Sequence, residues 1–223
     1  MDVAFLEKNI LLVDPKLQNP KKEKLNKDRT VYVELAWTNL SYTSLVRIKN
    51  VKSKSFCCFT SAPSQKSVPA KLVIVRPSTQ KSEGAFKAYI CPYSNDFVHA
   101  IVLERAADVM FTANMDGCTF GIGQPSPQGV VRVAHANAQG IESKSDTPDP
   151  QRREQVRMLK QEGTDQHIVD PYAYVDRAPF GHGHTAVTVG LRDPKSNRWS
   201  FYYQHHLHDH PAMRTLLKLV QVN

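Results

Sequence analysis

The sequence has no long apolar run and little glycine. No stretch of its 223 residues approaches the 18 uninterrupted apolar positions that mark a membrane-spanning helix. Only 10 residues are glycine and 14 are proline, without a repeating period, which excludes a collagen-like chain. Hydrophobic residues make up 41% of the chain and charged residues 22%, so full disorder is excluded and a folded core is expected.

The sequence also lacks the cysteine spacings of a disulfide framework or a zinc site. Its 4 cysteines are Cys57, Cys58, Cys91 and Cys118, and the adjacent pair has no intervening residues that would let both thiolates bind one metal. We expect Cys57 and Cys58 to be a reduced pair, because adjacent cysteines bridge only with strain. Cys91 precedes a proline at a predicted strand end and is expected to be structural.

We expect no Sec signal peptide at the N-terminus, because acidic residues lie near its start and no Ala-x-Ala cleavage site follows. Residues 15–29 are rich in lysine and have little to bury. We therefore expect a segment and basic connector over residues 1–29 and a single domain over residues 30–223, although a loop within one domain is an equal alternative. The net charge of +8 favours an acidic partner. No RNP-like aromatic pattern or zinc finger accompanies it, so nucleic acid is not expected.

Alternating apolar and polar residues predict a mainly β, α+β fold: a β-sandwich of mixed or antiparallel sheets with peripheral helices and loops. A proline near the start and a glycine at the end predict a helix over residues 150–163. Residues 211–221 suit a closing helix, or a strand in their last part. The predicted strands cover residues 30–37, 44–51, 71–76, 86–90, 97–103, 109–112, 118–122, 130–135, 185–191 and 199–204.

One segment has the residue types of a thiol active site. Gly117 allows a tight turn before Cys118, and His135 ends the next predicted strand, which would pair with the strand that begins at Cys118. An imidazole beside the sulfur would favour the thiolate and then act as acid and base. The alternatives are a small core cysteine and an exposed histidine at a strand end.

This segment resembles glutamine deamidase toxins. The run Thr112-x-x-Met115-x-Gly117-Cys118 looks like the nucleophile strand of the family of the Burkholderia lethal factor and the cytotoxic necrotizing factors. The later His135-Ala-Asn-Ala is similar to the histidine strand of that family, and residues 185–204 resemble its final hairpin more weakly. Two departures are Asp116, where the family usually has serine, and a longer separation between cysteine and histidine.

The resemblance implies a β-sandwich toxin or effector of bacterial origin, secreted or injected into the host cytosol. It would hydrolyse the side-chain amide of a glutamine in a host regulatory protein, with transglutamination as a possible side activity. Cys118 would be the nucleophile and His135 the acid and base, with Thr112 orienting the imidazole. Backbone amides of Gly117 and Cys118 would stabilise the oxyanion.

The same resemblance implies a monomer that needs no metal or organic cofactor. Substrate choice would depend on the loops around the sulfur, which the sequence suggests at residues 124–129, 141–150 and 178–184. The polar residues singled out in these loops are Gln124, Gln128, His182 and His184.

Two other functions stay open. Histidines are concentrated near the C-terminus, and a His-x-His pair on a strand presents both rings on one face, as a metal-dependent hydrolase would need. Few acidic residues accompany them, chiefly Asp193 and Asp209, so a surface cluster sensitive to pH is the simpler interpretation. A basic, non-catalytic binding module is the other alternative. The six clustered histidines are His182, His184, His205, His206, His208 and His210.

Overall fold

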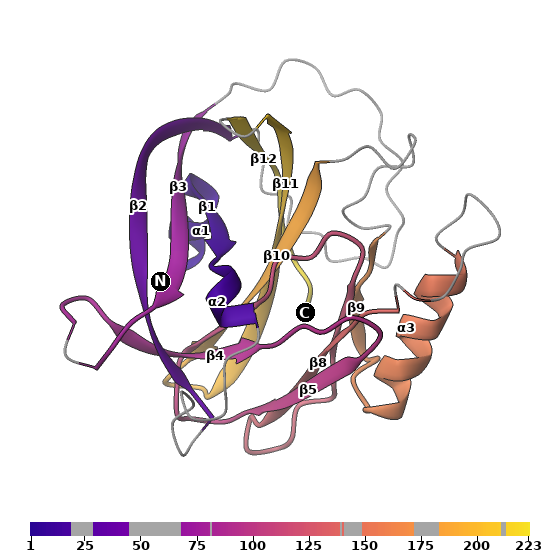
Figure 1. Cartoon of the computed structure of the whole chain (residues 1–223). Coiled ribbons are helices and arrows are strands. Elements are labelled where there is room, and N and C mark those ends of the chain that lie inside the picture. The colour runs from indigo at the N-terminus through magenta and orange to yellow at the C-terminus, as the bar shows by residue number, and fades with distance from the viewer. Residues whose placement is uncertain are drawn as a thin grey trace.

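The computed structural model describes residues 1–18, 29–44, 68–80, 82–138, 140, 149–171, 183–210 and 213–223. Their strands form two sheets, and helices are few (Figure 1). The mainly β, α+β fold expected from the alternation is therefore confirmed. No helix in these ranges combines the length and the apolar character needed to cross a membrane. Cys57 and Cys58 lie outside the described residues.

The larger sheet bends until it is nearly a barrel. Strand β2 pairs with β3 along most of its length, with β4 at its start and with β12 at its end. The additional pairing joins β4, at one end of the strand order, back to β2, so the strands from β2 to β4 close into a ring around an interior. In the described residues the order is β1 (Asn9–Val13), β3 (Val68–Pro77), β2 (Val31–Ser44), β12 (Met213–Gln221), β11 (Arg198–His210), β10 (His184–Asp193), β6 (Val109–Thr112) and β4 (Phe86–Cys91).

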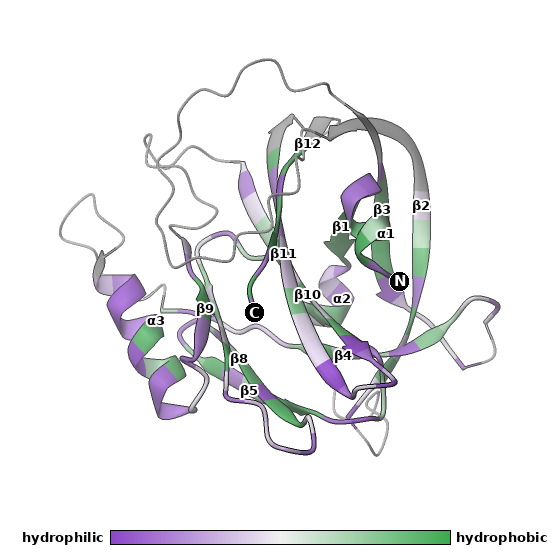
Figure 2. Cartoon of the chain, turned by 180° about the vertical axis from the view of Figure 1, so that it is seen from behind, coloured by the Kyte–Doolittle hydropathy of each residue, from purple (hydrophilic) through white to green (hydrophobic). Residues whose placement is uncertain are grey.

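The N-terminal residues fill this interior. Helix α1 (Val3–Lys8), strand β1 and the short helix α2 (Pro15–Gln18) lie between β2 and β3 on one side and β10 to β12 on the other (Figure 1). Strand β1 is strongly apolar (Figure 2), and Leu6, Leu11 and Leu17 are buried. The structure thus places residues 1–18 inside the domain and not on a separate segment, because their apolar side chains complete its core.

A buried glutamine of β11 holds the N-terminal residues by their backbone. The side-chain oxygen of Gln204 accepts a hydrogen bond from the backbone N–H of Leu11 at 2.9 Å. Its amide nitrogen donates to the carbonyls of Leu6 at 2.7 Å and Asn9 at 2.6 Å. These bonds satisfy backbone groups that water does not reach, which is the usual condition for burying them.

The smaller sheet, seen in the described residues, has the order β5 (Val98–Leu103), β8 (Val131–Ala136), β7 (Thr119–Ile122) and β9 (His167–Val169). Helix α3 (Asp149–Gln161) covers its outer face (Figure 1). A Cβ on Gly121 would lie 2.2 Å from the carbonyl oxygen of Thr164, so only glycine allows the end of this helix to approach β7 so closely.

The two segments with predicted helices have different outcomes. Helix α3 confirms the prediction over residues 150–163. Residues 213–221 form strand β12, so the strand alternative at the C-terminus is correct and the closing helix is wrong. Strand β12 pairs with β11 and joins it to β2, and these long-range pairings decide the outcome.

Candidate active site

Cys118, His135 and Asn137 lie on one face of the hairpin formed by β7 and β8. Phe120 pairs with His135 and Thr119 with Ala136, so continuing this antiparallel register places Cys118 opposite Asn137. The strand pairing that the sequence predicted for Cys118 and His135 is therefore present. His135 is the diagonal neighbour of Cys118, and such diagonal positions are about 7–8 Å apart between their Cα atoms.

The sulfur of Cys118 is buried and is contacted by N–H donors. The side-chain nitrogen of Asn137 donates to it at 3.3 Å, and the backbone N–H of Asp116 also points toward it. Burial raises the pKa of Cys118 to about 12, the two N–H groups oppose this rise, and the negative charge of Asp116 adds to it. The thiol is consequently neutral near pH 7 in this structure.

The imidazole of His135 is buried without a hydrogen-bond partner. Its side chain is 1% exposed, and neither ring nitrogen is bonded to any described residue. The alternative of an exposed strand-end histidine is therefore wrong. Burial lowers the pKa of His135 to about 3, with a smaller contribution from the nearby His99. The ring of Tyr93 packs against this imidazole with 5.6 Å between ring centroids.

Helix α3 contributes a buried residue that the sequence analysis missed. Gln155 accepts a hydrogen bond from the hydroxyl of Thr119 at 2.5 Å and donates to the carbonyl of Gly117 at 3.0 Å. It therefore binds both residues that flank Cys118, the backbone of Gly117 and the side chain of Thr119. Gly117 has a φ of 153°, a conformation that residues with a Cβ rarely adopt. The chain bends at Asp116 and Gly117, just before the cysteine.

Asn137 was also missed as a site residue, although the sequence carried a signal for it. It follows His135 by two positions, and residues two apart on a strand share one face. Its side-chain oxygen accepts a hydrogen bond from the backbone N–H of Asp96 at 3.0 Å. Asn137 is 7% exposed, so its amide lies within the core beside the thiol.

Thr112 does not contact His135 through its hydroxyl. The oxygen of this buried side chain accepts a hydrogen bond from the backbone N–H of Thr188 at 2.9 Å, which connects β6 to β10 in the larger sheet. The expected hydroxyl contact with the imidazole is not formed, because both nitrogens of His135 are unbonded within the described part of the chain. Thr112 instead joins two strands next to the site.

Gln124 and Gln128 lie far from the sulfur. Both are exposed in the turn between β7 and β8, whereas Cys118 and Asn137 lie at the other end of that hairpin. This turn contacts the connection between β10 and β11, where Asn197 donates to the carbonyl of Gln128. The suggestion that residues 124–129 border the sulfur is corrected by this topology. Residues 141–148 and 178–182, including His182, lie outside the described residues.

Among the C-terminal histidines whose side chains the structure describes, two form a hydrogen-bonded pair. His184 and the buried His205 are hydrogen bonded ring to ring at 2.8 Å across β10 and β11. Burial lowers the pKa of His205 to about 3, and Lys218 adds to this effect. Within the described ranges, no three His, Cys, Asp or Glu side chains gather as a metal site would require.

A cavity of about 520 Å³ borders the site. Tyr93 and Asp116 line it, and these two residues also contact His135 and Cys118 respectively. Asn114 and Val13 also line it and are joined by a pair of bonds, from the backbone N–H of Val13 to the side-chain oxygen of Asn114 at 3.1 Å and from the side-chain nitrogen of Asn114 to the carbonyl of Val13 at 3.0 Å. Further lining residues are Asp14, Ile74 and Thr185. Neither Cys118 nor His135 lines this cavity, so it adjoins the site only through Tyr93 and Asp116.

The arrangement contains a thiol, a neutral imidazole and N–H donors, and groups of these kinds are used in acyl transfer. No family model matches the chain, and no curated protein matches it. The chemistry of the site is therefore argued from its own residues.

Proposed function

We propose that this chain is a cysteine-dependent deamidase that converts the side-chain amide of a protein glutamine into a carboxylate. The observation that carries the proposal is the buried, unbonded imidazole of His135 on the same face of the β7–β8 hairpin as the buried thiol of Cys118. A purely structural histidine in a core usually has a hydrogen-bond partner, because leaving its nitrogens unbonded costs free energy. An imidazole that must exchange protons with a neighbour during a reaction has a reason to be unbonded at rest.

In the proposed reaction, His135 takes the proton of Cys118 and the sulfur attacks the carbon of the glutamine amide. The tetrahedral intermediate then breaks its C–N bond as His135 returns the proton to nitrogen, and ammonia leaves. Water loses a proton to His135 and attacks the thioester. The C–S bond breaks, the sulfur recovers the proton, and the glutamine has become a glutamate. An amine that replaced water would give a transglutaminase side activity.

The glutamine enters from the cavity lined by Tyr93 and Asp116. Tyr93 packs against His135, so a turn of this ring brings the cavity into contact with the catalytic pair. The described structure is then the closed, resting form with a neutral thiol and a neutral imidazole. Catalytic contacts often tighten only when substrate binds, so the missing bond between His135 and Cys118 is compatible with this role.

The origin of the substrate follows from the resemblance to glutamine deamidase toxins. We propose that the substrate is a regulatory protein of a host cell with an exposed glutamine, and that the chain reaches the host cytosol from a bacterium. One turnover per target molecule would exchange a neutral amide for a negative charge, which alters any surface on which that glutamine makes contacts.

The proposal is tested by incubating the purified chain with a eukaryotic cell extract and comparing protein masses before and after. One glutamine of one protein should gain about 1 Da, the difference between an amide and an acid, with release of ammonia. Cys118→Ser should reduce the rate at least about 1,000-fold, because a neutral hydroxyl is a far weaker nucleophile at this site.

Cys91→Ser is the matched control. Cys91 is buried in the same core cluster, and its thiol contacts the backbone N–H of His135 but is not bonded to the imidazole. It belongs to no step of the proposed reaction, so this variant should keep its activity. A metal chelator should leave the rate unchanged. Equal activity of the Cys118→Ser protein and the parent, or loss of activity with the chelator, would overturn the thiol mechanism.

A further inference from the structure

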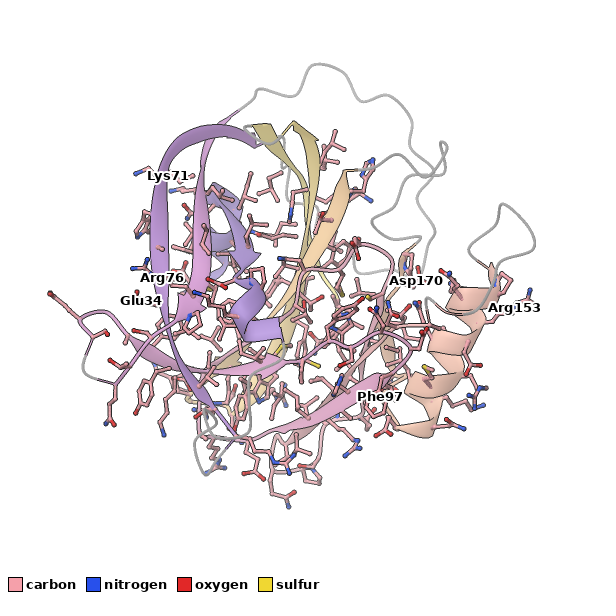
Figure 3. The ribbon with its side chains drawn as sticks, viewed as in Figure 1. Glu34, Lys71, Arg76, Phe97, Arg153 and Asp170 are labelled. Atoms are coloured by element: carbon pink, nitrogen blue, oxygen red, sulfur yellow. The ribbon has the colours of Figure 1, made fainter. Side chains whose placement is uncertain are left out.

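The amide of Asn137 is fixed in an orientation that aims one N–H at the sulfur. Its oxygen is bonded to the backbone N–H of Asp96, and its own backbone N–H donates to the carbonyl of Phe97 at 3.0 Å. With the oxygen committed to a backbone donor, the NH₂ end is turned toward Cys118, where it donates to the sulfur at 3.3 Å. Phe97, just before β5, is shown in Figure 3.

This donor matters more once the sulfur carries a charge. A hydrogen bond to an ionised acceptor is roughly twice as strong as one between neutral groups. The surroundings otherwise oppose a negative sulfur, because it is buried and the carboxylate of Asp116 is nearby. The titratable groups facing this sulfur also include Tyr93, whose charge interacts with that of Cys118. An N–H that strengthens its bond as the proton leaves offsets part of this opposition.

We propose that Asn137 is a third catalytic residue of this site, whose side-chain N–H holds the sulfur of Cys118 as it becomes a thiolate. The proton passes from the sulfur to His135, and the negative charge left on sulfur is shared with the Asn137 N–H and the backbone N–H of Asp116. The inference uses the catalytic cysteine of the proposed function, but its test measures the thiol alone.

Asn137 also differs from an asparagine that serves only the fold. Asn9 is 6% exposed, nearly the same as Asn137, and its side chain donates at 2.7 Å to the carbonyl of Phe5. That bond is to backbone, in the N-terminal helix, as most side-chain hydrogen bonds are. The N–H of Asn137 is directed instead at a thiol, which is a weak acceptor while neutral.

The test is the rate at which iodoacetamide alkylates Cys118, measured by mass spectrometry on the folded protein between pH 7 and pH 10. Asn137→Leu keeps the branching of the side chain at Cγ and removes the donor without adding charge. Asn137→Asp keeps the shape and the oxygen that accepts from Asp96. Both should slow alkylation at a given pH by about 10- to 100-fold, the loss expected for one hydrogen bond to a charged group.

Asn9→Asp is the matched control, since it makes the same change at the same depth of burial. Its alkylation rate should stay within about twofold of the parent, because a distant change does not alter the thiol. A slow rate for Asn137→Asp alone, with a normal rate for Asn137→Leu, would mean that the added charge acts and the donor does not. That result would overturn the proposal, as would normal rates for both variants.

A second measurement needs no variant and remains informative if both substitutions prevent folding. The side-chain amide protons of Asn137, followed by NMR in the parent protein, should shift when Cys118 is alkylated, while those of Asn9 stay in place. Unmoved Asn137 resonances would contradict the contact. Altered thiol rates without any glutamine deamidation would leave the role of Asn137 intact and refute only the proposed function.

Discussion

Gln204 and His135 are both buried polar side chains, but their bonding is opposite. Gln204, in the larger sheet, uses both ends of its amide to hold three backbone groups of the N-terminal residues. His135, in the smaller sheet, bonds through neither of its ring nitrogens within the described part of the chain. Both are less than 2% exposed, so burial alone does not distinguish a residue that stabilises the fold from a residue with another role.

The difference lies in what each group gains from folding. Gln204 exchanges water for protein donors and acceptors, so its desolvation is offset. His135 loses water and gains packing against Tyr93, which leaves the desolvation of both nitrogens uncompensated. A residue that lowers stability in this way is more readily explained by chemistry than by the fold, because active sites are where such local costs persist.

The largest expected effect on stability comes from removing the bonds of Gln204. Gln204→Leu leaves the N–H of Leu11 and the carbonyls of Leu6 and Asn9 buried without a partner. We expect the free energy of unfolding to fall by about 3–5 kcal/mol, since each orphaned group costs about 1–3 kcal/mol and some relaxation occurs. Urea unfolding followed by the fluorescence of the buried Trp199 measures it.

Gln128→Leu is the control for that change, because the side chain of Gln128 is exposed in a turn. Its free energy of unfolding should stay within about 0.5 kcal/mol of the parent value. If Gln204→Leu were equally harmless, the N-terminal residues would be held by their apolar packing alone, and the contrast with His135 would disappear.

The second prediction concerns His135 and acid. Its imidazole has a pKa of about 3 in the folded protein and an ordinary value of 6.5, so between these values only the unfolded chain binds the proton. The free energy of unfolding therefore falls as pH is lowered through this range, by up to about 1.4 kcal/mol for each pH unit. His135→Leu removes this contribution and, at pH 7, should leave stability within about 1 kcal/mol of the parent.

Urea unfolding of the parent and of His135→Leu at pH 6.5 and pH 4.5 gives the comparison. The variant should gain about 2–3 kcal/mol relative to the parent over this interval. His205, whose pKa is also lowered to about 3 by burial, titrates in both proteins and cancels from the difference. A constant difference between the two proteins across this range would mean that His135 is protonated in the fold, and the proposed resting state would be wrong.

Local patterns predicted those parts of the fold whose partners lie nearby. The alternation of apolar and polar residues predicted the bounds of β4, β7 and β8 to within a residue or two. The proline near the start of α3 and the glycine after its end predicted that helix. The N-terminal strand was missed because its partners are remote in sequence: β3 pairs with it, and Gln204 lies 193 residues beyond Leu11. A short apolar segment before a lysine-rich stretch gives no local sign of that position.

The candidate site was predictable to the same degree. The pairing of the strands that carry Cys118 and His135 followed from their alternation, and the structure confirms it. Alternation does not give the register between the two strands, so Asn137, which lies directly opposite Cys118, was not identified as a site residue. Gln155 comes from a helix 38 residues after Gly117, and its contact depends on how α3 packs on the sheet. The catalytic roles themselves stay predictions.

The smallest expected effect is the change in the reaction rate of the Cys118 thiol when Asp116 is replaced. Asp116 is a position at which the sequence departs from the family it resembles. Its carboxylate raises the pKa of Cys118, although less than burial does, and its backbone N–H opposes that rise. Asp116→Asn removes the charge and keeps the N–H, so the thiol should react with iodoacetamide about two- to fivefold faster at pH 8. Asp165→Asn, an exposed position beyond α3, should leave the rate unchanged. An unchanged rate in the Asp116→Asn protein would show that solvent screens this charge, and burial with the Asn137 donor would then set the reactivity of the sulfur.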